Sequence, residues 1–210
     1  MKLFWSLLIF LVLIHLPISA QDEIWTTEFS DDGNVKVVYR IYDSLMVSGE
    51  EEKFIEYTAT TKTSASLENC AAVFNNPDMH KKFYEYTEVS DKIEDVSKNE
   101  WIIYYYYSPP WPIADSDCVS RITMKTDSSN FRIVFTSISE PNLIEMKDVT
   151  RSELNTITFT FTKINSLEVE IFIEAILIPE TAAPKWMMRA WFPDGPAGTL
   201  NRFKELAENL

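Results

Sequence analysis

Residues 167–177 read LEVEIFIEAIL, and this stretch decides the fold class. Apolar side chains recur at every second position and glutamates fill most of the others: Leu167, Val169, Ile171, Ile173 and Ala175 against Glu168, Glu170 and Glu174. A period of two is typical of a β-strand with one buried and one solvated face. We therefore expect a sheet with a dry side that must be covered, and a glutamate row that is solvated rather than catalytic.

Six further segments carry a strand signal. β-branched, aromatic and apolar residues dominate them and polar turns such as 48–50 and 127–129 lie between them, which predicts strands over 35–42, 54–63, 101–107, 119–125, 130–137 and 156–162. Short turns between neighbouring strands favour antiparallel hairpins.

Two segments change to the period of a helix. Ser66 is suited to an N-cap, and Leu67, Cys70, Ala71 and Phe74 follow at helical spacing before 75–77 (Asn-Asn-Pro) stops the helix. Near the C-terminus, an apolar segment at 186–192 precedes a helical run that reaches Leu210. Pro193, Gly195 and Pro196 lie between the two, and proline there must interrupt or kink the helix.

The first 20 residues resemble a secretory signal peptide. Lys2 is the only charge before an apolar run over 3–16, which Pro17 ends, and small or tolerated residues precede Gln21. A membrane anchor is the alternative, but the run falls short of the roughly 20 residues that cross a bilayer. We expect export to a periplasmic or extracellular compartment, with residues 21–210 forming a single soluble domain.

Composition limits the function classes. The chain has 19 Lys and Arg against 32 Asp and Glu, so its net charge of −13 argues against nucleic-acid binding. Only two histidines occur, His15 and His80, and the first falls in the expected signal peptide. This excludes a multi-histidine metal site in the mature chain, and any Ser-His or Cys-His nucleophile would have to use His80. We expect His80 to be exposed.

Neither the glycines nor the cysteines point to a cofactor. Four glycines form no phosphate-binding loop, and no cofactor is implied. Cys70 and Cys118 could close one disulfide in an oxidising compartment, yet both positions also suit small buried thiols. Asp115 and Asp117 lack a calcium-loop pattern, so we interpret them as turn-capping residues.

Two motifs resemble the START (steroidogenic acute regulatory protein-related lipid transfer) domain family. Residues 109–119, PPWPIADSDCV, are similar to its P-W-P-[VI]-x-x-R-D-[FY]-V signature, and residues 184–203 are similar to its final helix, P-x-W-[LM] through D-G-P-x-x-T-[LF]. Ser116 stands where the family usually has arginine, while Asp117 is kept. This departure removes an expected ion pair.

The resemblance implies an α+β helix-grip fold, in which a curved antiparallel sheet wraps around a long C-terminal helix. It also implies a cavity that binds a lipid or other hydrophobic small molecule for transport or sensing, with no chemistry performed on it. We expect a monomer whose acidic surface permits only transient membrane contact. An enzyme of the cyclase or hydrolase type and an interaction module with a filled cavity are the two alternatives.

Seven residues are candidate ligand contacts: Arg121, Tyr105, Tyr107, Trp111, Glu174, Met187 and Trp191. Arg121 either points inward, where it could pair with Glu174 and bind a head group, or is an exposed surface arginine. The two tyrosines either supply pocket hydroxyls or belong to the core. We expect Trp111 to pack its loop, and Met187 and Trp191 to face the sheet together with Ala190.

Overall fold

The computed structural model describes residues 24–111, 113–145, 148–179 and 183–210, so the expected signal peptide at 1–20 lies outside the described residues. The elements follow in the order β1 (Thr26–Phe29), β2 (Lys36–Leu45), β3 (Glu51–Thr63), α1 (Leu67–Asn75), α2 (Pro77–Phe83), β4 (Thr87–Ser97), β5 (Glu100–Tyr107), β6 (Ser116–Asp127), β7 (Arg132–Ser139), β8 (Thr150–Arg151), β9 (Asn155–Lys163), β10 (Val169–Leu177), α3 (Lys185–Arg189) and α4 (Asp194–Glu208).

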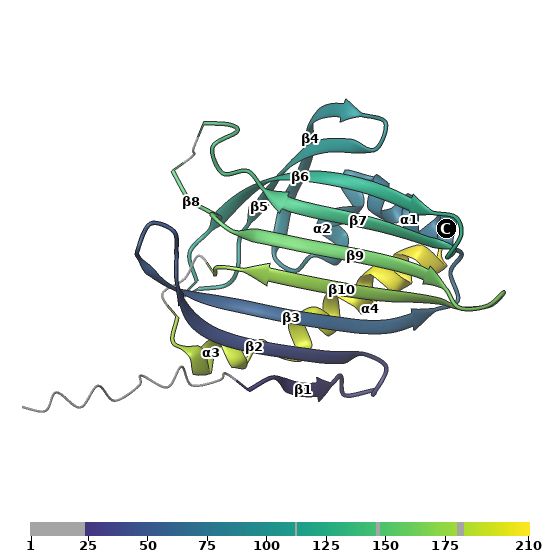
Figure 1. Cartoon of the computed structure of the whole chain (residues 1–210), viewed down its shortest axis with the longest axis horizontal. Helices are drawn as coiled ribbons and strands as arrows, with labels where there is room; N and C mark the ends of the chain where they lie inside the picture. Colours follow the sequence, from purple (N-terminus) through teal and green to yellow (C-terminus); the bar gives the residue numbers. More distant parts are fainter. Residues whose placement is uncertain (1–23, 112, 146–147, 180–182) are drawn as a thin grey trace, which may run out of the picture.

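One curved sheet contains all the strands. Its order is β1-β2-β3-β10-β9-β7-β6-β5-β4, every neighbouring pair is antiparallel, and β8 adds a short parallel pairing to β6. Figure 1 shows that the sheet bends around α4, with α1 and α2 beside this helix on the same face. The expected helix-grip architecture is therefore confirmed.

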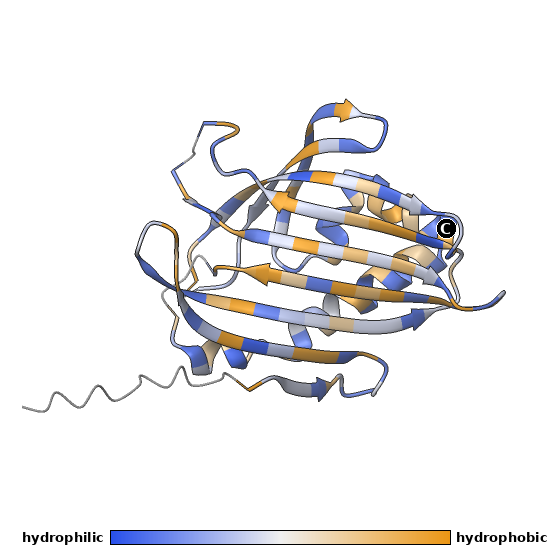
Figure 2. Cartoon of the chain, viewed as in Figure 1, coloured by the Kyte–Doolittle hydropathy of each residue, from blue (hydrophilic) through white to orange (hydrophobic). Residues whose placement is uncertain are grey.

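Alternation along the strands separates a dry concave face from a wet convex face. In β10, Val169, Ile171, Ile173 and Ala175 are buried, whereas Glu174 is exposed. Figure 2 shows hydrophobic and hydrophilic residues alternating along the strands. The solvated glutamate face predicted from the sequence is confirmed, because Glu174 is exposed and Glu168 and Glu170 are half-buried, while the alternating residues between them are buried.

The α1 helix begins and ends where its sequence predicts. The Ser66 hydroxyl accepts a hydrogen bond from the Asn69 backbone N–H at 3.0 Å, which satisfies one of the unpaired donors of the first turn. The helix ends at Asn75, and the Asn76 side chain then caps α2. Cys70 and Phe74 lie on the buried face of α1.

The C-terminal segment is divided into two helices. The short α3 ends at Arg189 and α4 starts at Asp194, so the predicted interruption is confirmed at 190–193. Gly195 and Pro196 fall inside the first turn of α4 rather than in the break. Proline is tolerated there because the first N–H groups of a helix have no intrahelical partner.

Two strands at opposite edges of the sheet were not predicted. β1 has only four residues. β4 is polar and mostly exposed, and its pairing with β5 contains three register shifts. Such bulges disturb the period of two, so β4 carries little strand signal in its sequence. Cys70 and Cys118 are both buried, and no disulfide joins them. Within the described ranges no helix combines the length and apolarity needed to span a bilayer.

Candidate functional site: an apolar mouth above a layer of hydroxyl groups

An apolar hollow of about 250 Å³ opens between the sheet, the β5–β6 connection and the C-terminal segment. We call it the apolar mouth, and it is lined by Ile55, Ile113, Ala114, Ser116, Leu177, Pro179 and Trp191. Ile55 and Leu177 face each other across the β3–β10 pair, which explains why they meet at this rim. Apolar linings with few polar groups are typical of sites for hydrophobic ligands.

Trp191 forms the wall of the mouth on the side of the C-terminal segment. Its ring meets Tyr57 edge to face with centroids 5.8 Å apart, and its indole N–H donates to Glu85 Oε2 at 3.4 Å. Gly195 gives the indole room, because a Cβ at this position would lie only 1.8 Å from Trp191 Cε2. Trp191 is therefore held from three sides, by β3, by the chain after α2 and by α4.

We expected Met187, Ala190 and Trp191 to face the sheet together, and this is wrong for Met187 and Ala190. Met187 and Ala190 are exposed, whereas Met188 and Phe192 are buried. Phe192 stacks on Tyr39 with ring centroids 3.9 Å apart. The physical reason is that α3 ends at Arg189, so residues 187–191 do not follow one continuous helical face. Of the two candidate contacts in this segment, Trp191 lines the mouth and Met187 does not.

A layer of hydroxyl groups lies one step deeper than the mouth on the concave face. We define this hydroxyl layer as Tyr57, Tyr84, Tyr105, Tyr107, Ser116 and Ser120. Tyr57 follows Ile55 inward along β3, and Tyr105 and Tyr107 pair with Cys118 and Ser116 across β5 and β6. The structure thus places the candidate residues Tyr105 and Tyr107 in the interior, close below Trp191 and the rim.

The tyrosines of this layer stay protonated at neutral pH. Burial raises the pKa of the Tyr57 hydroxyl above its usual value of 10, and it does the same for Tyr84 and Tyr105. Tyr84 lies deep inside the fold, yet part of its side chain remains accessible. Of this layer, Ser116 also lines the mouth, and the Tyr57 ring meets the mouth residue Trp191 edge to face, so the hydroxyl layer begins directly beneath the hollow.

His80 lies beneath the layer and is wholly buried, so the expectation that it is exposed is wrong. Its Nε2 lies 2.7 Å from the Phe74 carbonyl oxygen and its Nδ1 lies 2.7 Å from the Tyr105 hydroxyl. Because the carbonyl only accepts, Nε2 carries the proton and Tyr105 donates to Nδ1. Burial lowers the pKa of His80 to about 4, so the ring is neutral at pH 7.

The far end of the interior is filled by six phenylalanines, each fully buried: Phe74, Phe83, Phe135, Phe159, Phe161 and Phe203. We call this group the phenylalanine plug. Phe74 and Phe135 are stacked with centroids 4.5 Å apart, and Phe161 and Phe203 are 5.2 Å apart. The plug joins α1, α2 and α4 to the sheet and limits the hollow to the other end.

Arg121 and Glu174 do not form the internal ion pair that we considered, and that expectation is wrong. Arg121 lies on the convex face, where it binds both Glu140 oxygens and donates to Glu100 Oε1 at 2.7 Å. Glu174 is exposed on the convex face of β10. Glu174 alternates with the buried residues of β10, and Arg121 shares its face of β6 with Val119, which packs with Ile102 and Tyr104 in a cluster separate from the main core.

The β5–β6 connection also departs from expectation. Trp111 is 92% exposed and does not pack its loop. Asp117 does not cap a turn, because it is buried in a bidentate ion pair with Arg151. The ion pair that Ser116 was expected to remove is therefore supplied from β8 instead. Asp115 accepts hydrogen bonds from Tyr106 at 2.5 Å and Ser108 at 2.9 Å, and these bonds lower the pKa of its carboxyl group.

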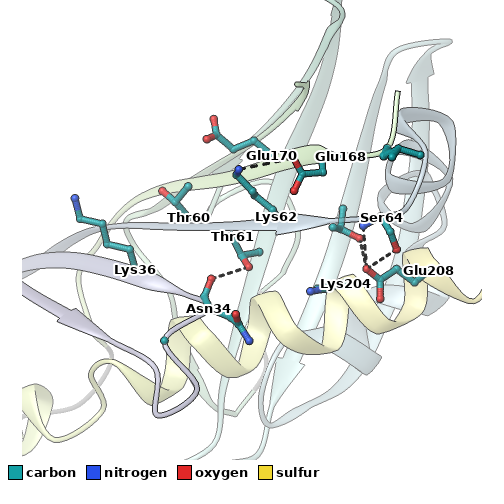
Figure 3. Close-up of a pocket in the computed structure, with 13 residues that line it drawn as sticks. Asn34, Lys36, Thr60, Thr61, Lys62, Ser64, Glu168, Glu170, Lys204 and Glu208 are labelled. Carbon is teal, nitrogen blue, oxygen red and sulfur yellow. Dashed lines mark hydrogen bonds and ion pairs between the residues drawn. The ribbon is translucent and has the colours of Figure 1, made fainter. Parts of the chain in front are cut away.

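A larger hollow of about 740 Å³ lies at the opposite end of the molecule (Figure 3). Charged and polar side chains line it, among them Lys36, Lys62, Lys204, Glu170 and Glu208. We call it the polar groove. The carboxylate of Glu208 accepts hydrogen bonds from the Thr63 side chain at 2.8 Å and from the Ser64 side chain at 3.1 Å, and Figure 3 shows Glu208 beside Ser64. These bonds fasten the end of α4 to β3, and the mixed charges do not suit a hydrophobic ligand.

Several residues of the site were missed from the sequence. Ile55, Leu177 and Pro179 line the mouth, and Tyr57, Tyr84 and His80 lie deeper in the interior. The strand positions carried a usable signal, because Ile55 and Tyr57 are the inward residues nearest the turn that precedes β3. His80 and Tyr84 had none, since their burial depends on how α2 packs on the sheet. Within the described ranges, no group of three or more His, Cys, Asp or Glu side chains is placed to hold a metal ion.

Comparison with known proteins adds likeness in fold. No family model matches the sequence, and no curated protein matches it. A STAR-related lipid transfer protein from Xanthomonas axonopodis superposes with a TM-score of 0.73 and 16% identity, over 88% of this chain and 98% of that one. The human StarD13 (DLC2) lipid transfer and protein localization domain gives 0.68 and 17%, over 90% and 91%. The Zhui aromatase/cyclase from Streptomyces sp. R1128 gives 0.54 and 12%, over 74% and 94%.

These likenesses define the class: the chain has the START-type helix-grip fold, as its two motifs predicted. The interior of this chain passes from an apolar mouth through the hydroxyl layer to the phenylalanine plug.

Proposed function

We propose that this chain binds a hydrophobic small molecule or lipid in the apolar mouth and carries or senses it without performing chemistry on it. The observation that supports this most strongly is the apolar hollow between Ile55, Leu177 and Trp191. It lies where the concave sheet meets the C-terminal segment, so movement of that segment would admit or release the ligand. Structurally similar proteins that are named lipid transfer proteins are consistent with this role.

The surroundings of the mouth support transient contact with a membrane. Large apolar side chains are exposed on the β2–β3 turn, the β5–β6 connection and α3: Leu45, Val47, Trp111, Ile113, Trp186 and Met187. These three segments lie at the same end of the molecule in Figure 1. Tryptophan is well suited to the membrane interface, where one part of the ring is apolar and the N–H is wet. We propose that these three exposed apolar segments touch a bilayer while the ligand passes.

Native mass spectrometry with lipid extraction tests the proposal most simply. We expect a co-purifying apolar molecule in roughly stoichiometric amount. A chain that is always empty, and whose melting temperature does not rise with any member of a lipid panel, would instead support an interaction module. Conversion of a bound compound into a product would support the cyclase-like or hydrolase-like alternative.

A pair of tryptophan variants separates the role of the mouth from that of the exposed apolar segments around it. Trp191→Ala removes a wall of the hollow and should weaken ligand binding more than it lowers stability. Trp186→Ala is the matched control, because Trp186 is 67% exposed and does not line the hollow. We expect this control to keep ligand affinity in solution and to reduce binding to neutral vesicles. The reverse assignment of the two effects would contradict the proposal.

Compartment and assembly are further parts of the proposal. We propose that the chain acts after export, since residues 1–20 combine one charge, a short apolar run and a small-residue exit. N-terminal sequencing of the exported protein should start at Gln21. We also propose a monomer, and light scattering of the purified protein checks it.

A further inference from the structure

We infer that the mouth selects an uncharged hydrophobic molecule that carries a hydroxyl or carbonyl group, and that this group enters first and bonds to the hydroxyl layer. The inference rests on the proposed function and specifies its ligand. Three observations lead to it: among the described residues no fully buried charged residue faces the concave interior, the tyrosine hydroxyls there are protonated, and the layers are ordered along the path inward.

The first observation concerns charge. Among the described residues that are buried, Asp117 and Arg151 are the only Asp, Glu, Lys or Arg, and they pair with each other outside the concave face. Arg121 and Glu174, the two groups that could have met a charged head, both lie on the convex face. His80 is neutral. A charged ligand group would therefore enter the interior without a counter-charge, which is costly.

A carboxylate beside the mouth adds a second barrier to anions. Glu85 is half-buried beside the mouth, where its Oε2 accepts the Trp191 indole N–H. A ligand carboxylate or phosphate that passes Trp191 would approach this negative group. Like charges at close range repel each other, and the repulsion grows where water is excluded. An uncharged polar group meets neither this repulsion nor the cost of losing its counter-ion.

The second observation concerns the hydroxyls. Burial raises the pKa of Tyr57 and of Tyr84, so both hydroxyls keep their protons at pH 7. Their hydroxyls can thus both donate and accept. The Tyr105 hydroxyl gives its proton to His80, so its oxygen still accepts. A ligand hydroxyl, which also donates and accepts, fits this set best, and a carbonyl fits the donors alone.

The third observation is the order of the layers. The mouth is lined mostly by aliphatic and aromatic residues, the hydroxyl layer lies next, and the phenylalanine plug closes the path behind it. An apolar group placed against these hydroxyls would exclude water without replacing its hydrogen bonds, so a ligand group that bonds to them is favoured over an apolar one. The ligand's apolar body would then remain between Ile55, Leu177 and Trp191, with its polar group innermost.

Three probes that share the naphthalene ring system test this selection: 2-naphthol, naphthalene and 2-naphthoate. Each is titrated into the purified chain by calorimetry at pH 7. They share a ring system and differ only in a hydroxyl, a hydrogen or a carboxylate. We expect 2-naphthol to bind about threefold to tenfold more tightly than naphthalene, which is the effect of one added hydrogen bond. We expect 2-naphthoate to bind at least about tenfold more weakly than 2-naphthol.

Conservative variants connect the preference to the layer. The double variant Tyr57→Phe/Tyr84→Phe removes two hydroxyls and keeps both rings, so 2-naphthol and naphthalene should bind to it with nearly equal affinity. Tyr86→Phe is the matched control, because Tyr86 is exposed outside the hollow, and it should keep the preference. Thermal unfolding of each variant verifies that it is folded.

The possible results distinguish this inference from the proposed function. Equal binding of 2-naphthol and naphthalene by the wild-type chain, or tightest binding of 2-naphthoate, would overturn the inference and leave a hydrophobic carrier. A preference for 2-naphthol that survives in the double variant would also overturn it, because the hydroxyls would not be its source. Failure of all three probes to bind would count against the mouth as a ligand site and so against both.

Discussion

The two ends of the interior differ in how their space is filled. At the end of α1 and the C-terminal half of α4, six phenylalanines pack against one another and leave no room. At the end of α3, the same concave sheet carries aliphatic residues and hydroxyls around a hollow of about 250 Å³. The strands run through both ends, so the difference arises from their side chains and from the helices and connections that cover each end. One end is filled with aromatic rings, and the other keeps an apolar hollow.

This division follows from the cost of each choice. Aromatic packing gains dispersion and removes apolar area from water, so the plug stabilises the fold strongly. A hollow loses those contacts, and buried hydroxyls add a further cost when they lack partners. A protein that keeps such an end therefore forfeits stability there, and a ligand that fills it restores part of that loss. Variants at the two ends should consequently affect different measurements.

The largest effect is expected in the plug. Phe159→Ala removes a fully buried ring that contacts Phe74, Phe83 and Phe203. It should lower the free energy of unfolding by about 3–5 kcal/mol, as urea denaturation would show. Trp191→Ala, at the other end, should cost less stability than this. If the two variants cost the same, the division between the ends is incorrect.

A somewhat smaller loss is expected outside the mouth. Asp117→Asn leaves the buried guanidinium of Arg151 without its counter-charge, although the guanidinium keeps its bond to the Pro141 carbonyl at 2.8 Å. We expect the free energy of unfolding to fall by about 3 kcal/mol. The double variant Asp117→Leu/Arg151→Met should be more stable than Asp117→Asn in the same assay, because no buried charge remains.

The boundary between the two ends should respond to pH through His80. Its pKa is lowered from 6.5 to about 4 by burial, so between these values the unfolded chain binds a proton that the folded chain does not. Stability should therefore be complete above about pH 6.5 and decline as the pH falls to about 4, by about 3 kcal/mol for this group. In His80→Gln, a urea-denaturation series over pH 4–7 should lose this part of the slope. An unchanged slope would mean that His80 is not buried.

The smallest stability effect is expected at Gly195, which lies against the mouth residue Trp191, and ligand binding should change most there. Gly195→Ala places a methyl group 1.8 Å from the original position of Trp191 Cε2, so the indole must move. We expect a loss of about 1–2 kcal/mol in thermal unfolding, a shift in tryptophan emission and weaker ligand binding.

Gly198→Ala is the matched control in the same helix. The nearest atom to its new Cβ is the flexible end of Arg202 at 3.2 Å, and alanine is a better helix former than glycine. It should preserve both emission and binding. A loss of binding in Gly198→Ala that equals the loss in Gly195→Ala would show that the effect is general to α4 and not specific to Trp191.

The sequence predicted the fold better than the site, and particular residues show why. Alternation in 167–177, the Ser66 cap and the proline break before α4 are local signals, and each appears in the structure where its residues predict. β4 was missed because bulges hide its period. Met187 was wrongly expected to face the sheet beside Ala190 and Trp191. Because α3 ends after five residues, residues 190–192 do not continue the same helical face.

The site depends on contacts between distant parts of the chain. The structure places Tyr105 and Tyr107 in the interior, one of the alternatives left open for them, and Trp191 lines the mouth, as helical spacing suggested for it. The positions of Arg121 and Glu174 followed from alternation, but which face is concave depends on how the whole sheet curves. The burial of His80 and the Asp117–Arg151 pair join segments 25 and 34 residues apart, which local patterns do not reveal.

One measurement tests directly whether the ligand occupies the mouth. In methyl-detected NMR of the isotope-labelled chain titrated with 2-naphthol, the methyl groups of Ile55, Ile113 and Leu177 line the mouth, whereas those of Leu167 line the polar groove. We predict that the first three shift and show contacts to the probe, and that Leu167 does not change. Shifts confined to Leu167, or to the methyl groups of Ile171 beside the phenylalanine plug, would contradict binding in the mouth.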